Sequence, residues 1–216
     1  MPKKRVIFYV DGFNFYYGIK AMSKHKPDWR KFYWIDFLAL FEQFIEEDEE
    51  LYLVRYFTAR PKNYGKTKRQ NMLMGINKKI NGEKLKIHYG RYTDKPMTCR
   101  VSGGCGGSYM HWEEKETDVN LAVKMIEDCY NGVCNKVVLV SADSDFLPPL
   151  RLVNNIHQDI EQMILFPPAK FASPLQNFGC PVLNMEKYKP RWNKALLDDV
   201  VEINDNKYRK PIEWAI

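Results

Sequence analysis

The chain has 216 residues, of which 45% are hydrophobic and 28% charged, so it can bury the core of a folded domain, which excludes a wholly disordered protein. The 33 Lys and Arg and 27 Asp and Glu give a formal net charge of +6. The longest uncharged apolar runs have about the length of a strand, far below the roughly 20 residues that span a bilayer, and the first residues do not read as a secretory signal. We therefore expect a cytoplasmic protein that does not enter a membrane.

Short apolar strands alternate with amphipathic helices along the chain. Runs of β-branched and aromatic residues predict five strands, at residues 4–10, 51–58, 83–92, 136–141 and 159–166. Apolar residues at helical spacing predict four helices between them, at about residues 37–45, 64–80, 119–126 and 146–156. This alternation predicts an α/β fold with a mainly parallel sheet and helices on both of its faces.

Two stretches do not follow this rhythm. Residues 94–111 hold four glycines and two cysteines without periodicity, which predicts an inserted loop. From Glu186 onward, Lys-Pro-Arg-Trp precedes a short apolar stretch at residues 195–201. We expect a C-terminal helix or strap that packs on the domain.

The five cysteines are an odd number and do not form the framework of a disulfide-rich domain. Cys99 and Cys105 lie in the glycine-rich stretch, with His88 and His111 on either side. A structural Zn²⁺ site takes four ligands, usually in pairs that two to four residues separate, and this pair is wider. Two interpretations stay open: a Zn²⁺ site that includes Cys99 and Cys105, or two reduced thiols in a loop.

Acidic residues stand where strands end and helices begin. Asp11 follows the first strand, Asp143 and Asp145 follow the fourth, and Asp118 opens a helix. In a parallel sheet, the carboxyl ends of the strands share one edge, where ligands bind, so these four carboxylates are expected to converge. Carboxylates in proximity repel one another unless a cation intervenes, and Mg²⁺ or Mn²⁺ prefers such oxygen ligands.

A metal at this edge would activate water and neutralise the charge that develops on a phosphodiester. Asn14 is three residues after Asp11 and would orient a water or a phosphate oxygen from the same edge. For a single acid, such as Asp118 or Asp145, the alternative is a helix N-cap. Ser141 offers a hydroxyl group at this edge, although a serine at a strand end often bonds the local backbone.

Three other enzyme classes lack their motifs in this sequence. The chain has no Gly-x-Ser-x-Gly turn of a serine hydrolase. A phosphatase of the haloacid dehalogenase type needs Asp-x-Asp after the first strand, but position 13 is Phe. Dinucleotide binding needs Gly-x-Gly-x-x-Gly at the same place, where the chain has Asp-Gly-Phe-Asn-Phe.

Positive charge is concentrated between residues 60 and 100. This segment carries twelve Lys or Arg against two acids, and Tyr64, Tyr89 and Tyr92 lie among them. Cations that neutralise phosphates, together with rings that stack on bases, would suit RNA; the alternative is a solvated helix face. The candidate RNA-binding residues are Lys62, Lys66, Lys68, Arg69 and Arg91.

Three motifs together resemble those of the NYN domain family of PIN-like nucleases. They are Tyr-Val-Asp-Gly-Phe-Asn-Phe at 9–15, Glu-Lys-Glu-Thr-Asp-Val-Asn-Leu-Ala at 114–122 and Ser-Ala-Asp-Ser-Asp-Phe at 141–146. The resemblance covers about residues 4–185. It implies a PIN-like, Rossmannoid three-layer α/β/α fold and a metal-dependent ribonuclease site. The positions that match the family's site are Asp11, Asn14, Asp118, Asp143 and Asp145.

Two positions depart from the family pattern. Ala142 and Glu116 stand where many relatives have glycine. We expect Ala142 to be harmless unless the backbone there needs a positive φ. Glu116 either adds a fifth carboxylate or favours the helix N-terminus.

The resemblance divides the chain into a nuclease domain at 1–185, with its insertion at about 94–111, and a C-terminal extension at 186–216. The expected function is a Mg²⁺- or Mn²⁺-dependent ribonuclease that cuts as an endonuclease, with single-stranded or structured RNA as its substrate. The alternative is an RNA-binding or scaffold module that does not cut. PIN-like domains commonly form homo-oligomers. The resemblance therefore allows for a homo-oligomer of this chain.

Overall fold

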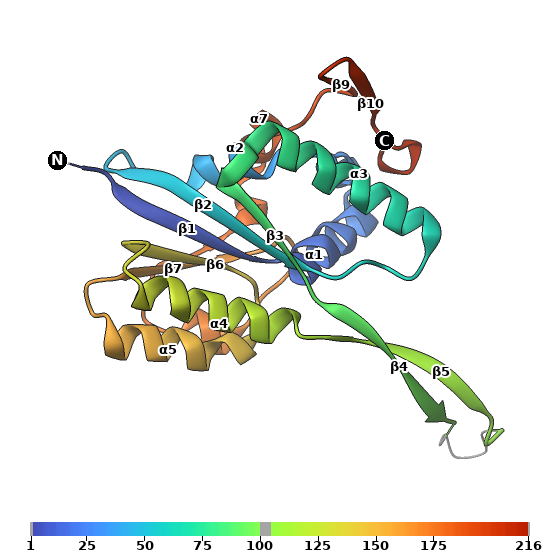
Figure 1. Cartoon of the computed structure of the whole chain (residues 1–216), viewed down its shortest axis with the longest axis horizontal. Helices are drawn as coiled ribbons and strands as arrows, with labels where there is room; N and C mark the ends of the chain where they lie inside the picture. The colour runs from blue at the N-terminus through green and yellow to red at the C-terminus, as the bar shows by residue number, and fades with distance from the viewer. Residues whose placement is uncertain (1, 100–104, 216) are drawn as a thin grey trace.

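The structure, a computed structural model, describes residues 2–99 and 105–215. At its centre lies a parallel six-stranded sheet in the order β3-β2-β1-β6-β7-β8 (Figure 1). Its strands are β1 (Lys4–Asp11), β2 (Glu49–Thr58), β3 (Leu85–Tyr89), β6 (Lys136–Val140), β7 (Glu161–Phe166) and β8 (Val182–Asn184). The order runs outward in both directions from β1 and β6, as in a doubly wound sheet. The predicted PIN-like, Rossmannoid α/β fold is therefore confirmed.

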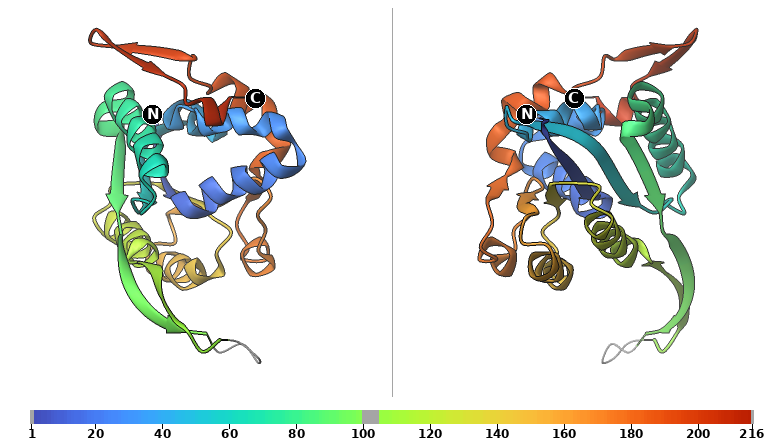
Figure 2. Two further views of the ribbon diagram at one scale, coloured as in Figure 1. Left: turned by 90° about the vertical axis from the view of Figure 1, so that its right-hand side faces the viewer. Right: turned by 60° about the vertical axis from the view of Figure 1, so that its left-hand side comes forward.

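Helices cover both faces of the sheet (Figures 1 and 2). One face carries α1 (Gly12–His25), α2 (Phe37–Phe41), α3 (Tyr64–Asn81) and α7 (Lys189–Lys194). The other carries α4 (Thr117–Tyr130), α5 (Leu147–Ile156) and α6 (Ser173–Gln176). Strand β1 is buried on both sides: Val6, Phe8 and Val10 join the first core, whereas Ile7 and Tyr9 join the second. Successive side chains of a strand point to opposite faces, so β1 connects the two cores.

Short 3₁₀ helices complete the connections. They are η1 (Pro27–Tyr33), η2 (Glu42–Phe44), η3 (Gly82–Lys84), η4 (Ser144–Phe146), η5 (Met185–Tyr188) and η6 (Ile212–Trp214). The helix predicted at 37–45 is therefore a five-residue α-helix followed by a 3₁₀ turn. The strand predicted at 83–92 is shorter than expected, because β3 ends at Tyr89 and Gly90 separates it from the next strand.

Helix α1 follows β1 without a loop, and it is not among the helices predicted from the sequence. Phe15, Ile19 and Met22 are buried at helical spacing and pack into the first core. The helix starts close to β2, where a Cβ atom on Gly12 would stand 2.5 Å from the Phe57 carbonyl oxygen. Glycine is therefore needed at the turn that joins β1 to α1.

The segment predicted as an inserted loop is instead an antiparallel ribbon. Strands β4 (Arg91–Thr98) and β5 (Ser108–Lys115) pair along their whole length and project from the body of the molecule (Figures 1 and 2). Both faces of the ribbon are largely exposed, so its sequence lacks the alternation of a half-buried strand. Near its end, the backbone N–H of Cys99 donates to the Gly107 carbonyl oxygen at 2.9 Å. Residues 100–104 of the predicted insertion lie outside the described residues.

The C-terminal residues pack against the first face of the sheet. The predicted helix is present as α7, and its Trp192 is fully buried, with its ring 5.5 Å from those of Phe15 and Trp29. A hairpin of β9 (Val200–Ile203) and β10 (Asn206–Arg209), which the sequence did not predict, follows. The chain then returns to the body at η6, where the ring of Trp214 stacks on that of Tyr33 at 5.8 Å.

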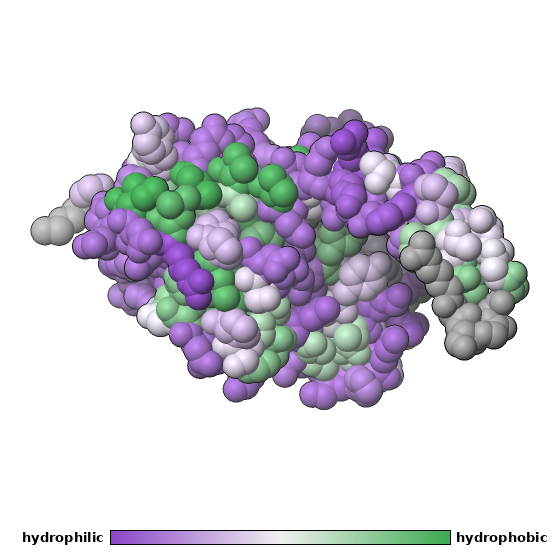
Figure 3. All heavy atoms as spheres, turned by 90° about the horizontal axis from the view of Figure 1, so that it is seen from below, coloured by the Kyte–Doolittle hydropathy of each residue, from purple (hydrophilic) through white to green (hydrophobic). Residues whose placement is uncertain are grey.

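The outer surface of α4 and α5 differs from that of α3. It exposes four aliphatic residues, namely Val119, Val123, Leu152 and Ile156. Figure 3 views this side of the molecule and shows a hydrophobic band among hydrophilic residues. Phosphate-binding surfaces are rich in Lys and Arg, so this side does not match one. No helix within the described part of the chain is both long and apolar enough to cross a membrane.

Candidate active site

The candidate site lies where the two halves of the sheet diverge. Strands β1 and β6 are neighbours, but the helix after β1 covers one face and the helix after β6 covers the other. A crevice forms at such a switch point, outside the carboxyl ends of the strands. Asp11 is the last residue of β1, and the loop after β6 carries Ser141, Asp143 and Asp145. Together with Asp118 at the start of α4, the four aspartates form what we call the carboxylate rim.

Asp11 is the buried member of the rim, with 2% of its surface exposed. Its Oδ1 caps α1 by accepting from the backbone N–H groups of Phe13 at 3.1 Å and Asn14 at 3.0 Å. Its Oδ2 accepts from the side-chain amide of Asn14 at 2.7 Å and from the Ser141 hydroxyl at 2.8 Å. Four donors therefore fix this carboxylate, and Asn14 and Ser141 bind it directly.

The loop after β6 is held by its own side chains. The backbone N–H of Asp143 donates to Ser141 Oγ at 3.0 Å, and that of Asp145 donates to Asp143 Oδ1 at 3.0 Å. Asp143 thus caps η4, whereas Asp145 lies exposed within η4. Ala142 is not among the residues with a positive φ, so the glycine of relatives is not needed at this position.

Asp118 reaches the rim from the opposite side, in the first turn of α4. The N-cap of this helix is Glu116, so the alternative interpretation of Asp118 as the cap is wrong. Glu116 adopts a φ of 80°, in the left-handed region, which the glycine of relatives can adopt without strain. Its carboxylate pairs with Arg91 Nε at 2.7 Å. Glu114, which the sequence did not single out, accepts from both the backbone N–H and the hydroxyl of Thr117.

The acids of the rim influence one another's protonation. Partial desolvation, together with the charges of Asp11, Glu114, Asp143 and Asp145, raises the pKa of Asp118 to about 6. Burial also raises the pKa of Asp11, although its hydrogen bonds from Asn14 and Ser141 oppose this effect and the charge of Asp143 adds to it. The four carboxylates are therefore near enough for their charges to affect one another. Their repulsion would be relieved by a cation.

The donors of the rim fit a hard metal ion that keeps part of its water. Within residues 2–99 and 105–215, no three His, Cys, Asp or Glu side chains are grouped closely enough to hold a metal by themselves. Mg²⁺ usually retains several waters and binds proteins through one or two carboxylates. Asp118 and Asp145 are exposed and Asp143 is half-buried, so they are accessible to such an ion. Asp11 already accepts four hydrogen bonds.

The predicted RNA-binding cations divide into three that are paired and two that are not. Lys62 pairs with Asp94 at 2.9 Å, Arg69 pairs with Glu213, and Arg91 pairs with Glu116. Lys66 and Lys68 lie exposed in the first half of α3, and neither has an ion-pair partner among the residues described. A phosphate backbone would therefore find its most available cations at Lys66 and Lys68.

The predicted cysteine pair lies at the far end of the ribbon. Cys99 follows β4, and Cys105 is exposed. The described residues place no third Cys, His, Asp or Glu with them in a metal-binding group. A Zn²⁺ site that includes Cys99 and Cys105 therefore stays a prediction.

Comparisons with known proteins agree with this architecture. The family model "NYN domain" matches residues 5–180. A curated relative, 6-hydroxy-3-succinoylpyridine 3-monooxygenase HspA of Pseudomonas putida, is 26% identical in an alignment of 193 residues that covers 76% of this chain. The chain spans 59% of the length of that relative. A crystal structure of a protein of unknown function from Vibrio parahaemolyticus matches 91% of this chain and 98% of its own, with a TM-score of 0.55 and 14% identity, which shows a shared fold.

Proposed function

Since the chain belongs to the NYN domain family, a family of PIN-like nucleases, we propose that it is a metal-dependent ribonuclease that hydrolyses RNA phosphodiester bonds at the carboxylate rim. One observation carries this proposal: four aspartates from three separate segments affect one another's charge at the switch point of the sheet, namely Asp11, Asp118, Asp143 and Asp145. Such an arrangement costs stability through repulsion and is typical of a functional site. We propose an endonuclease that works in the cytoplasm.

Each acid has its own part in this proposal. One or two of the accessible acids Asp118, Asp143 and Asp145 would hold Mg²⁺ or Mn²⁺. The ion would supply a water of lowered pKa and neutralise charge on the phosphate. Asp11 is the member of the rim whose position is fixed, because four donors hold its carboxylate between β1, α1 and the loop after β6. Asn14 keeps its amide at the same edge and would orient a water or a phosphate oxygen.

The monooxygenase activity in the name of the Pseudomonas relative belongs to that protein. The alternative for this chain is an RNA-binding module that does not cut. Every acid of the family's site is present here, which supports the enzyme.

The proposal predicts that the purified protein cuts end-labelled single-stranded RNA in Mn²⁺ or Mg²⁺. A chelator should stop the reaction and excess metal should restore it, because the carboxylates alone cannot activate water at neutral pH. The measurement is the rate at which labelled fragments appear on a denaturing gel, with Ca²⁺ as a control ion of larger size. Cutting that continues in chelator would contradict the metal dependence, and RNA binding without any cutting would favour the binding module.

The cations of α3 provide a second test. Replacing Lys66 and Lys68 together by Gln should weaken binding to single-stranded RNA of any sequence, because both ammonium groups are available to phosphates. If each neutralises one phosphate, the slope of log affinity against log salt should become shallower by about 1.4.

The matched control for this test is the pair Lys78→Gln and Lys84→Gln. Lys78 lies in the last turn of α3 and Lys84 in η3 directly after it; both are exposed, and their replacement changes the net charge of the protein by the same amount. Affinity should be measured between 50 and 200 mM salt for both double variants, the range over which phosphate contacts have a large effect. An equal salt slope in the two variants would mean that RNA does not follow the first half of α3.

A further inference from the structure

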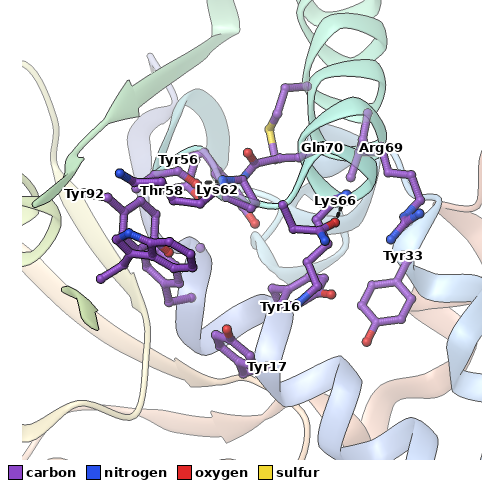
Figure 4. A pocket seen from close by; sticks show the side chains of 18 of the residues that line it. Tyr16, Tyr17, Tyr33, Tyr56, Thr58, Lys62, Lys66, Arg69, Gln70 and Tyr92 are labelled. Carbon is purple, nitrogen blue, oxygen red and sulfur yellow. Dashed lines mark hydrogen bonds between the residues drawn. The ribbon is translucent and has the colours of Figure 1, made fainter. Parts of the chain in front are cut away.

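A cavity of about 310 Å³ lies beside the carboxylate rim, between α1, α3 and the base of the ribbon (Figure 4). We call it the aromatic pocket. Aromatic side chains from several segments line it, including Tyr16 and Tyr17 of α1, Tyr56 of β2, and Tyr92 and Trp112 of the ribbon. Its volume is near the lower end of the range for small-molecule sites, so it has room for one small planar group and its substituents.

Two of the aromatic side chains that line the pocket are exposed to solvent. Trp112 is 53% exposed and Tyr17 is 46% exposed, although large aromatic side chains usually bury most of their surface. The two rings come from different segments that line the same cavity. Exposed rings of this kind are the surfaces on which the bases of single-stranded nucleic acids stack.

Polar groups with spare hydrogen-bonding capacity complete the pocket. Lys66 projects into it from α3 (Figure 4), and its ammonium group has no acidic partner among the residues described. Gln70, one turn further along α3, donates its amide hydrogens to Thr58 and Ala59 at 3.0 and 3.2 Å. Its Oε1 is buried and has no partner in the described part of the chain. A ligand could therefore offer an anion to the ammonium group of Lys66 and an N–H donor to Gln70 Oε1.

Neighbouring residues connect the pocket to the carboxylate rim on two sides, through Asp11 and through Glu114, whose charge acts on Asp118. Gly12 and Phe13, which line the pocket, follow Asp11 immediately. On the other side, Tyr92 lies directly opposite Glu114 in the ribbon. After burial itself, the charge of Asp11 is the main cause that raises the pKa of the Tyr56 hydroxyl, which shows how near the pocket floor is to the rim.

From this juxtaposition we infer that the aromatic pocket binds one nucleotide of single-stranded RNA, with its base on Trp112 and Tyr17 and a phosphate near Lys66. This inference rests on the proposed ribonuclease function and names the part of the substrate that the site recognises. A nucleotide combines a planar ring, N–H donors and an anion, which are the three features that the pocket accommodates. A bound nucleotide would place an adjacent phosphodiester next to the rim.

Part of the pocket is built from outside the family match. Trp214 of η6 forms one wall, and residues beyond 180 are not covered by the family model. The neighbouring Glu213 pairs with Arg69 of α3, which holds this wall in place. The pocket is therefore a feature that the C-terminal residues of this chain help to create.

The experiment measures binding of uridine and adenosine 5′-monophosphates to the whole protein by calorimetry, with ribose 5-phosphate as the comparison ligand. Nucleotides should bind at least about 5-fold more tightly than ribose 5-phosphate, because stacking of a base contributes about 1–3 kcal/mol. Trp112→Leu and Tyr17→Leu should each weaken nucleotide binding by about 5- to 150-fold and leave ribose 5-phosphate binding unchanged. Tyr130→Leu, which removes an exposed ring at the far end of α4, should have no effect.

The outcomes separate this inference from the ribonuclease proposal. If the protein cuts RNA but Trp112→Leu and Tyr17→Leu bind nucleotides like the unchanged protein, the pocket inference is wrong and the nuclease remains. If the protein does not cut RNA but binds nucleotides with the expected loss in both variants, the pocket stands and the catalytic proposal fails. Equal affinity for ribose 5-phosphate and the nucleotides would mean that the site recognises phosphate alone, which overturns the inference.

Discussion

Replacing Asp118 by Asn is expected to lower the rate of RNA cleavage by at least about 100-fold. Removing one group that stabilises charge in a transition state typically has an effect of this size. Asp118 is exposed, and its carboxylate makes no hydrogen bond or ion pair that the fold of the described residues depends on. The substitution removes one negative charge and a metal ligand while it keeps the shape of the side chain. RNA affinity and the midpoint of thermal unfolding should therefore change little.

The matched control is Glu127→Gln, which removes an exposed acid from the same helix. Glu127 pairs with Lys124 and lies about two and a half turns from the rim. Initial cleavage rates should be compared at saturating Mn²⁺ and RNA, and binding should be measured separately in chelator. Full cleavage by Asp118→Asn would remove this carboxylate from the mechanism, and an equal loss in Glu127→Gln would point to a general effect of charge on the helix.

Asp143→Asn should give a similar loss, because its Oδ1 can still cap η4 as an amide oxygen. Asp11→Asn is a poorer test. All four partners of Asp11 donate to it, so an amide would leave at least one donor facing another donor unless Asn14 or Ser141 reorients. We expect Asp11→Asn to destabilise the fold by about 1–3 kcal/mol, which would confuse its effect on cleavage with partial unfolding.

The rim could be predicted from sequence because two strong rules coincide there. Residues 4–10 and 136–141 are nearly continuous apolar runs, which is typical of strands that are buried on both faces. Parallel strands bring their carboxyl ends to one edge, so Asp11, Asp143 and Asp145 were expected to meet. The positive φ of Glu116 was not predicted, although the glycine of relatives at this position was a signal for it.

Features that depend on distant contacts could not be predicted. Helix α1 contains two glycines and five polar or basic residues that obscure its buried stripe, and its packing on α7 becomes visible only in three dimensions. Strand β8 has three residues, too few for a periodic pattern. The aromatic pocket joins Tyr17, Trp112 and Trp214, which lie up to 197 positions apart in the chain, and no local rule brings them together.

Replacing Asp128 by Ala is expected to destabilise the protein by about 3–5 kcal/mol, the largest effect on stability that we predict. Asp128 accepts from Arg55 at 2.5 and 2.7 Å and from the Tyr9 hydroxyl at 2.8 Å. The side chains of Arg55 and Asp128 are 12% and 5% exposed. Removing the carboxylate would leave a buried guanidinium without its counter-charge, which costs more than the lost hydrogen bonds alone.

The position of Asp128 also connects its loss to the rim. It lies on α4, ten residues after Asp118, and it binds Tyr9, which is two residues before Asp11 on β1. The contact with Arg55 of β2 ties the same helix to a second strand. These bonds set the position of α4 against the sheet, so Asp128→Ala should lower cleavage even under conditions where most of the protein remains folded.

The double variant Arg55→Met with Asp128→Leu separates the two causes. Apolar residues of similar size can replace a buried ion pair at little cost, so this variant should recover most of the free energy of unfolding that Asp128→Ala loses. Urea unfolding measures stability, and the rate of cleavage under native conditions measures the activity of the rim.

Recovery of both stability and cleavage would show that the penalty comes from the unpaired Arg55. Recovery of stability without cleavage would show that the bonds to Asp128 also place α4, and hence Asp118, against Asp11. If the single variant loses less than about 1 kcal/mol, the ion pair does not hold the helix to the sheet.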